Sequence, residues 1–204
     1  SRHRAHRTLP GPQPVPRRLV TRRPLRLTAG WAYPIDSPPL QNAAVLIGAN
    51  GRIAEVGPDQ SVPVPDGVDT INFPDAVLLP GLVNTHTHLE LTGLGESAPE
   101  DRFREWILTI RRLKEARGAE EFLEAARRGI RDCWSGGVTT IADTGDSGSV
   151  IQALAELGGS GVVYQEVFGP HPDQLAECFS GLVGRVGELR KYAGGRIRLG
   201  VSPH

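Results

Sequence analysis

The pattern of apolar and polar residues divides most of the chain into two regions. In the first, residues 25–79, apolar side chains alternate with other residues, as they do in a half-buried strand. The first alternating series consists of Leu25, Leu27, Ala29, Trp31 and Tyr33. Apolar residues 43–48 then lead to Asn50-Gly51, the strongest short signal for a hairpin turn, and residues 52–56 supply the returning strand. This region predicts a small all-β unit, too short to bury a sizeable core alone.

Beyond Pro80-Gly81, short apolar segments alternate with segments of helical period. Strands are expected at residues 82–88, 138–142, 161–168 and 196–201. Helices are expected between them, at residues 103–113, 122–133, 149–157 and 172–189. The last helix is expected to turn an apolar stripe inward, made of Leu175, Phe179, Leu182, Val186 and Leu189.

Parallel strands need crossover connections of this kind, so the pattern predicts an α/β fold with a parallel sheet. An open α/β sheet and a (β/α)₈ barrel both fit it. The β unit ahead of the first parallel strand, and the lack of a glycine-rich phosphate loop after that strand, favour the barrel.

The formal net charge is zero, but the charges are unevenly placed. Arginines precede the first acid, Asp36, without any opposing charge: Arg2, Arg4, Arg7, Arg17, Arg18, Arg22, Arg23 and Arg26. Basic arms can bind nucleic acid or anionic membranes, but closely spaced prolines interrupt this one and no aromatic residue offers base stacking. We expect residues 1–24 to be a disordered basic extension with neither partner. Because the chain contains no Met and its regular pattern begins after Val20, residues 1–19 are expected not to be native.

The overall composition is that of an ordinary globular protein, with 39% apolar and 23% charged residues. No apolar run approaches the ~20 residues of a membrane span, and the first twenty residues lack the apolar core of a secretory signal. The two cysteines, Cys133 and Cys178, do not suggest a disulfide framework. We therefore expect a cytoplasmic protein and leave open whether it forms a homo-oligomer.

The chemistry of the chain centres on His86-Thr87-His88, at the end of the first expected parallel strand. Residues two apart in a strand project to the same side, so both imidazoles can reach one ion. The carboxyl ends of the strands are also where barrel enzymes build their active sites. Spacing alone leaves two alternatives open, a metal site and a pair of surface or hydrogen-bonded histidines.

The surrounding sequence resembles that of a known family. Residues 78–90 read LLPGLVNTHTHLE, which is similar, almost residue for residue, to the signature that opens the barrel of the amidohydrolase superfamily. Residues 50–57 resemble part of that family's companion β-sandwich, and residues 136–143 resemble its second barrel strand. Residues 200–204 resemble its fourth strand, as found in the deaminase and chlorohydrolase branch.

The resemblance covers residues 25–204 and implies both fold and chemistry. Residues 80–204 would form strands one to four of a (β/α)₈ TIM barrel, and residues 25–79 the N-terminal part of a small β-sandwich domain. His86 and His88 match metal ligands. The implied cofactor is one divalent ion, with zinc favoured over iron, which activates a water molecule.

His204 matches a histidine that faces the substrate. The further implied residues, among them a His-x-x-Glu motif on strand five, would lie beyond His204. We therefore expect the 204-residue chain alone to be inactive. The carboxylated lysine that bridges two metals in some relatives has no counterpart at a strand end, since Lys114 and Lys191 fall in expected helices.

Several carboxylates remain as candidates. Glu166 is expected at the end of the third parallel strand, where it is either a metal ligand or a pocket-lining residue that meets substrate. Glu90, two residues past His88 in an extended chain, is expected either to meet substrate or to hydrogen-bond a loop. Asp143 and Asp146 are expected to be loop or turn residues.

Three interpretations follow from the resemblance. In the first, the protein hydrolyses carbon–nitrogen bonds other than peptide bonds by deaminating an amino-heterocycle or a nucleoside-like small molecule. In the second, it is a deacetylase or amide-cleaving enzyme with Glu166 as a metal ligand. In the third, it is a non-catalytic barrel subunit, which His86 and His88 argue against because a scaffold has no need of them.

Overall fold

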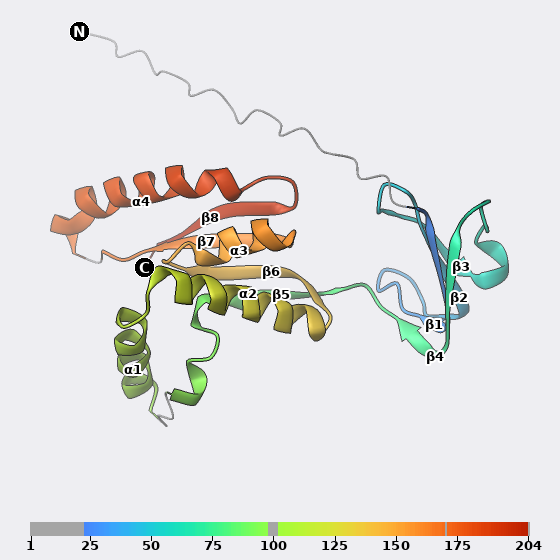
Figure 1. Ribbon diagram of the computed structural model, residues 1–204, viewed down its shortest axis with the longest axis horizontal. Helices are drawn as coiled ribbons and strands as arrows, with labels where there is room; N and C mark the ends of the chain where they lie inside the picture. Colours follow the sequence, from blue (N-terminus) through green and yellow to red (C-terminus); the bar gives the residue numbers. More distant parts are fainter. Residues whose placement is uncertain (1–22, 98–101, 170, 204) are drawn as a thin grey trace, which may run out of the picture. The chain divides into compact units, whose positions relative to one another are not determined.

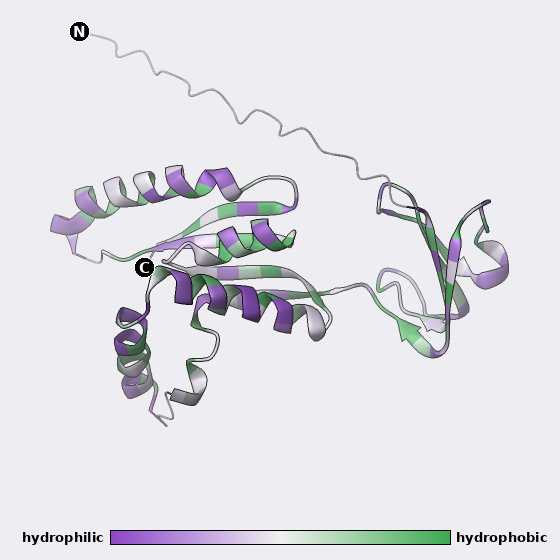
Figure 2. Ribbon diagram, in the orientation of Figure 1, coloured by the Kyte–Doolittle hydropathy of each residue, from purple (hydrophilic) through white to green (hydrophobic). Residues whose placement is uncertain are grey.

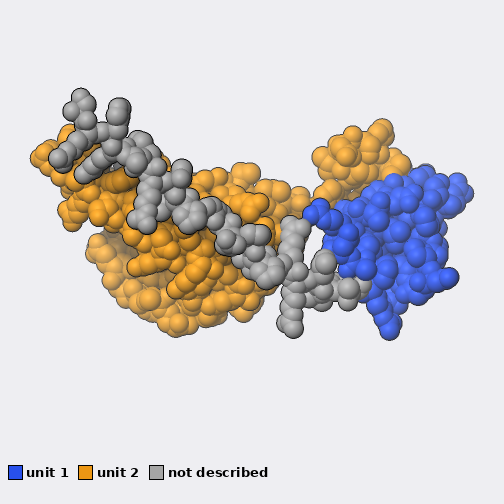
Figure 3. Space-filling view, turned by 90° about the horizontal axis from the view of Figure 1, so that it is seen from above, with its two compact units in different colours: residues 1–30, 41–76 blue, residues 31–40, 77–204 orange. Residues whose placement is uncertain are grey.

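The computed structural model describes residues 23–97, 102–169 and 171–203. The chain divides into two compact units, residues 1–30 with 41–76 and residues 31–40 with 77–204 (Figure 3). The expected basic extension, residues 1–24, falls almost wholly outside the described residues, as does the expected substrate residue His204.

A four-stranded sheet accounts for the expected all-β region. Its strands are β1 (Leu25–Ala32), β2 (Leu40–Ile47), β3 (Ile53–Pro58) and β4 (Asp69–Leu78), in the order β3-β2-β1-β4. β2 and β3 pair in antiparallel fashion around Asn50-Gly51, where Gly51 takes a φ of 71° that few other residues adopt. The hairpin predicted from Asn50-Gly51 is therefore confirmed.

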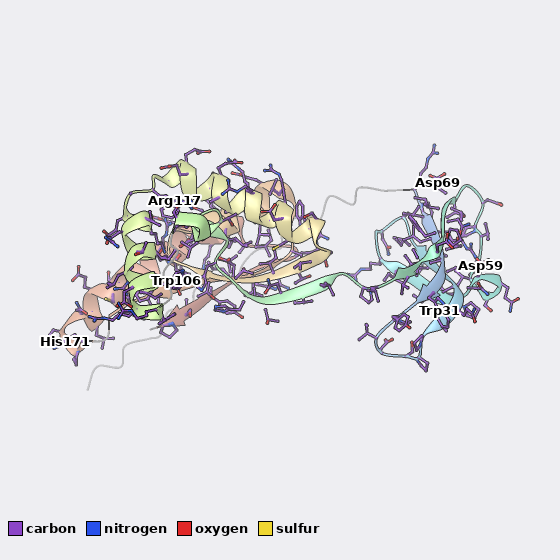
Figure 4. The ribbon with its side chains drawn as sticks, turned by 90° about the horizontal axis from the view of Figure 1, so that it is seen from below. Trp31, Asp59, Asp69, Trp106, Arg117 and His171 are labelled. Carbon is purple, nitrogen blue, oxygen red and sulfur yellow. The ribbon has the colours of Figure 1, made fainter. Side chains whose placement is uncertain are left out.

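The burial of Arg26 differs from the alternating pattern that is expected for β1. Its side chain is 5% exposed, and its Nη2 donates to the carboxylate of Asp59 at 2.6 Å and to the carbonyl oxygens of Asp59 and Val62 (Figure 4 labels Asp59). A buried guanidinium needs such partners to offset its desolvation. Arg26 thus belongs to the folded unit and not to a run of unpaired arginines, while Trp31 of the expected buried face is exposed.

A second four-stranded sheet is parallel, as predicted. It contains β5 (Leu82–Thr87), β6 (Val138–Gly145), β7 (Gly161–Val167) and β8 (Ile197–Pro203), in that order. Its crossovers carry α1 (Phe103–Glu115), α2 (Ala119–Ser135), α3 (Ser149–Leu157) and α4 (Leu175–Leu189). Short 3₁₀ turns add η2 (Leu89–Leu91), η3 (Gly95–Ser97), η4 (Pro172–Gln174) and η5 (Arg190–Tyr192), and η1 (Asp59–Ser61) follows β3.

The main core lies between this sheet and the helices α2 and α3 (Figure 1). Ile130 of α2, Ile151 and Leu154 of α3, and Ile141 of β6 are all buried in it. Gly136 and Gly137 end α2 as expected. Hydrophilic residues predominate on α1 and α2 (Figure 2), which leaves a narrow apolar stripe facing the core.

The apolar stripe of α4 turns inward only toward the C-terminal end of the helix, where Leu182 and Val186 are partly buried. Leu175 and Phe179 are 68% and 64% exposed, and Leu189 is the buried residue of the helix. The helical period in the sequence identifies an apolar face correctly but does not say what covers it. Within the described part of the chain, no helix is both long and apolar enough to cross a lipid bilayer.

Candidate metal centre at the ends of the parallel strands

Two histidines lie at the carboxyl end of β5. His86 is the penultimate residue of the strand, His88 directly follows its last residue, Thr87, and both side chains are exposed. Their ring centroids are 4.9 Å apart with the ring planes at 87°. This spacing is compatible with two imidazoles that bind one ion.

The orientation of His88 is set by a backbone carbonyl. Its Nδ1 lies 2.6 Å from the carbonyl oxygen of Thr144 in β6. A carbonyl oxygen only accepts, so Nδ1 carries a proton, and in the neutral ring the lone pair is then on Nε2. Metal-binding histidines usually donate their second ring N–H in this way. His88 is therefore prepared to bind an ion through Nε2.

Asp143 fixes the residues on both sides of His88. Its Oδ2 accepts from the Thr87 hydroxyl and from the Leu89 backbone N–H, each at 2.8 Å. The side chain is 0% exposed and its Oδ1 has no hydrogen-bond partner. Burial raises the pKa of Asp143 to about 7, although the bonds from Leu89 and Thr87 lower it, and the charges of Glu90 and Glu166 raise it further.

The expectation that Asp143 is a loop residue is therefore wrong. It lies inside β6, which runs three residues past its expected end at residue 142. The sequence does hold a signal for this position: Asp143 follows the apolar Ile141 by two residues, so both point to the same, helix-covered face.

The same alternation of side chains identifies the residues on the face of the sheet opposite the helices, which we call the open face. Thr87 bonds to Asp143 and so points toward the helices, which turns its neighbour His86 to the other face. In β7, Gln165 is buried and Glu166 takes the opposite side, in register with Ser202 of β8. Glu166 lies at the end of its strand as expected, on the face shared with His86.

Glu90 does not continue an extended chain, because the backbone turns into η2 after His88. Its side chain is 2% exposed. One carboxylate oxygen lies 2.6 Å from Nζ of Lys114, and the other accepts from the backbone N–H and hydroxyl of Ser147. Of the two expected roles, the described contacts are those of a carboxylate that hydrogen-bonds a loop.

Comparisons with known proteins identify the chain's relationships. The model of the amidohydrolase family matches residues 77–204, which is more than half of the chain. The chain belongs to the amidohydrolase family. The resemblance of residues 78–90 to that family's opening signature is thereby confirmed.

Individual amidohydrolase relatives include enzymes named as deaminases. A 5-methylthioadenosine/S-adenosylhomocysteine deaminase of Symbiobacterium thermophilum is 32% identical over 174 residues, covering 80% of this chain and 38% of the relative. An aminodeoxyfutalosine deaminase of Deinococcus radiodurans is 31% identical over 133 residues, covering 63% of this chain and 30% of the relative. The chain thus spans well under half the length of these relatives.

Solved structures confirm the fold class. An adenosine deaminase of Xanthomonas campestris with bound zinc superimposes with a TM-score of 0.74 at 24% identity, covering 88% of this chain and 42% of that structure. An atrazine chlorohydrolase of Arthrobacter aurescens with zinc gives a TM-score of 0.70 at 18% identity, covering 88% and 46%. The chain has the fold of the first four strands of an amidohydrolase (β/α)₈ barrel with the helices between them, preceded by part of the β-sandwich.

The described residues contain two candidate metal ligands. No group of three or more His, Cys, Asp or Glu side chains in them is arranged to hold an ion, so His86 and His88 form a pair that fits two of the positions around a metal. Lys114 and Lys191 lie in α1 and η5 and not in strands, as expected.

Proposed function

We propose that the protein is a metal-dependent deaminase of amino-heterocycles or nucleoside-like small molecules. The observation that carries the proposal is the exposed pair His86 and His88, with the ring N–H of His88 already engaged by Thr144. A pair of metal-binding histidines requires a defined tautomer, and this hydrogen bond supports one for His88. The names of the amidohydrolase relatives supply the substrate class.

His86 and His88 would hold one divalent ion, zinc in our proposal and iron as the other candidate. When bound, the ion would lower the pKa of water and prepare it to attack the carbon that carries the amino group. The chain's own part is positional: Asp143 holds the segment 87–89, and Thr144 holds the ring of His88.

Residues on the open face would meet the substrate. We propose Glu166 and His204 for this role; Glu166 shares its face with His86 and is the penultimate residue of β7. For Glu90, whose carboxylate binds Lys114 and Ser147, we propose a supporting role in place of the substrate contact that the sequence also allowed.

The second candidate function is also hydrolysis, but it cleaves an acetyl group or another amide instead of deaminating the substrate. Because Glu166 stands at a strand end on the face shared with His86, it is also placed for a carboxylate ligand of a deacetylase or amide-cleaving enzyme. The two candidates differ in their products, ammonia in one case and a carboxylic acid in the other. A non-catalytic subunit would give neither product.

The experiment supplies the zinc-loaded full-length protein with 5-methylthioadenosine, S-adenosylhomocysteine, aminodeoxyfutalosine and an N-acetylated amine. Ammonia release from at least one of the first three, lost in His86→Gln, is the expected result. Release of acetate without ammonia would support the second candidate. No product from a fully loaded protein would refute both.

The proposal also covers the cellular location and the partners of the protein. We propose a cytoplasmic enzyme, in keeping with Cys133 and Cys178, which are both free. Its partner would be a small-molecule substrate, without nucleic acid or membrane, and self-association into a homo-oligomer stays open.

A further inference from the structure

An ion cluster forms around the buried carboxylate of Glu90, two residues past His88. Glu90 accepts from Nζ of Lys114 at 2.6 Å, and the same ammonium reaches Asp146 at 2.5 Å. Burial alone would lower the pKa of Lys114, but its bonds to Asp146 and Glu90 outweigh that effect and leave the pKa raised. The lysine is therefore charged and bridges two carboxylates from different segments.

The cluster holds the backbone just after β6. Ser147 donates to Glu90 through its backbone N–H at 3.1 Å and through its hydroxyl. At Gly145 a Cβ would lie 2.8 Å from the Glu90 carboxylate, so this carboxylate rests directly against the backbone. From the other side, Gln165 of β7 donates to the carbonyl oxygen of Asp146 at 3.1 Å. Residues 145–147 are thus fixed at each position.

These residues follow Thr144, whose carbonyl oxygen accepts the ring N–H of His88. Glu90 in turn stands two residues after His88, and its own carbonyl oxygen is held at 2.8 Å by Arg117, which Figure 4 labels. The contacts therefore form a closed loop, from His88 through Thr144 to residues 145–147, across to Glu90 and back along the chain.

We propose that Glu90, paired with Lys114, is a positioning residue that fixes the imidazole of His88 through the Thr144 carbonyl. The proposal rests on the proposed role of His88 as a metal ligand. Burying the charge of Glu90 is costly when an apolar contact could pack the same space. An ion pair adds direction, because its bonds fix where residues 145–147 lie and hence where the Thr144 carbonyl points.

The test measures His88 itself as well as the metal. In metal-free full-length protein with ¹⁵N-labelled histidine, the ring signals of His88, identified by their loss in His88→Gln, report which nitrogen carries the proton. Zinc affinity is measured on the same samples by competition with a chelator. Lys114→Met removes the partner of Glu90, and Ser147→Ala removes one hydrogen bond while it keeps the ion pair.

Arg127→Met is the matched control. Arg127 also bridges acidic side chains, Glu120, Glu124 and Glu156, but on the outer surface of α2. We expect Lys114→Met to replace the single Nδ1-protonated form of His88 with a mixture and to weaken zinc binding by about 10–100-fold, the usual cost of losing a group that supports a metal ligand. Ser147→Ala should move both readouts in the same direction by less, and the control should move neither.

Wild-type ring signals and zinc affinity in both Lys114→Met and Ser147→Ala would overturn the proposal, even if their melting temperatures fall. Should Lys114→Met fail to fold, Ser147→Ala decides alone by the same criteria. A wild-type protein that binds no zinc would refute the proposed function, while the ring signals of the metal-free protein would still decide the positioning role.

Discussion

Replacing Asp143 by Asn tests the account of the strand end most closely. The protonated aspartate and the asparagine have the same shape, and in both a carbonyl oxygen can accept from Thr87 and Leu89 as Oδ2 does. The amide nitrogen would take the place of the buried Oδ1, which lacks a partner. The substitution therefore removes the ionisation of residue 143 and keeps its hydrogen bonds to the histidine segment.

The magnitude follows from the pKa. A value of about 7 in the folded protein, against 3.8 for a free aspartate, corresponds to about 4 kcal/mol at 1.36 kcal/mol per tenfold change. Because the folded pKa is raised, the stabilisation is fully present below about pH 4 and is lost as the pH rises toward 7. In Asp143→Asn this loss disappears, while the unpaired amide costs roughly 1–3 kcal/mol at every pH.

Urea unfolding of metal-free wild-type and Asp143→Asn protein from pH 4 to pH 8 measures the difference. The variant should be the less stable protein at pH 4 and the more stable one at pH 8, with the difference between them moving by about 4 kcal/mol. A difference that stays constant across this range would show that burial does not hold Asp143 neutral.

Other substitutions test the remaining contacts. Asp143→Ala leaves the Thr87 hydroxyl and the Leu89 N–H without their acceptor, so zinc affinity should fall by about 10–100-fold, whereas chelator competition should find Asp143→Asn close to wild type. Gly145→Ala places a Cβ 2.8 Å from the Glu90 carboxylate and should cost about 1–3 kcal/mol in urea unfolding; a neutral result would contradict the close contact. Gly184→Ala in α4, where a Cβ meets no atom within 4 Å, is its control and should stabilise the protein by about 0.5–1 kcal/mol.

Much of the fold could be predicted because it rests on local signals. The hairpin follows from Asn50-Gly51, and the parallel sheet follows from apolar segments separated by helical ones. Helix α3 occupies Ser149–Leu157, the range that the sequence predicts. The pattern does not identify which apolar residues a distant segment covers: Leu175 and Phe179 of α4 belong to the predicted stripe but are exposed.

The residues of the candidate site also fall into two groups, those that local sequence signals identify and those that only the fold identifies. His86 and His88 could be found from their spacing and their surrounding signature. Asp143, Glu90 and Lys114 acquire their roles from contacts between residues 24 to 57 positions apart, which no local pattern records. Arg26 is a similar case, because its partner Asp59 lies 33 residues away.

The central claim is that His86 and His88 hold one catalytic ion in a deaminating enzyme. The most direct measurement titrates zinc into metal-free full-length protein while ammonia release from 5-methylthioadenosine or another accepted nucleoside is followed. We predict that the rate rises from zero and reaches a plateau at about one equivalent, and that His86→Ala and His88→Ala give no rise. A full rate without metal, or a plateau only at two equivalents, would contradict the account.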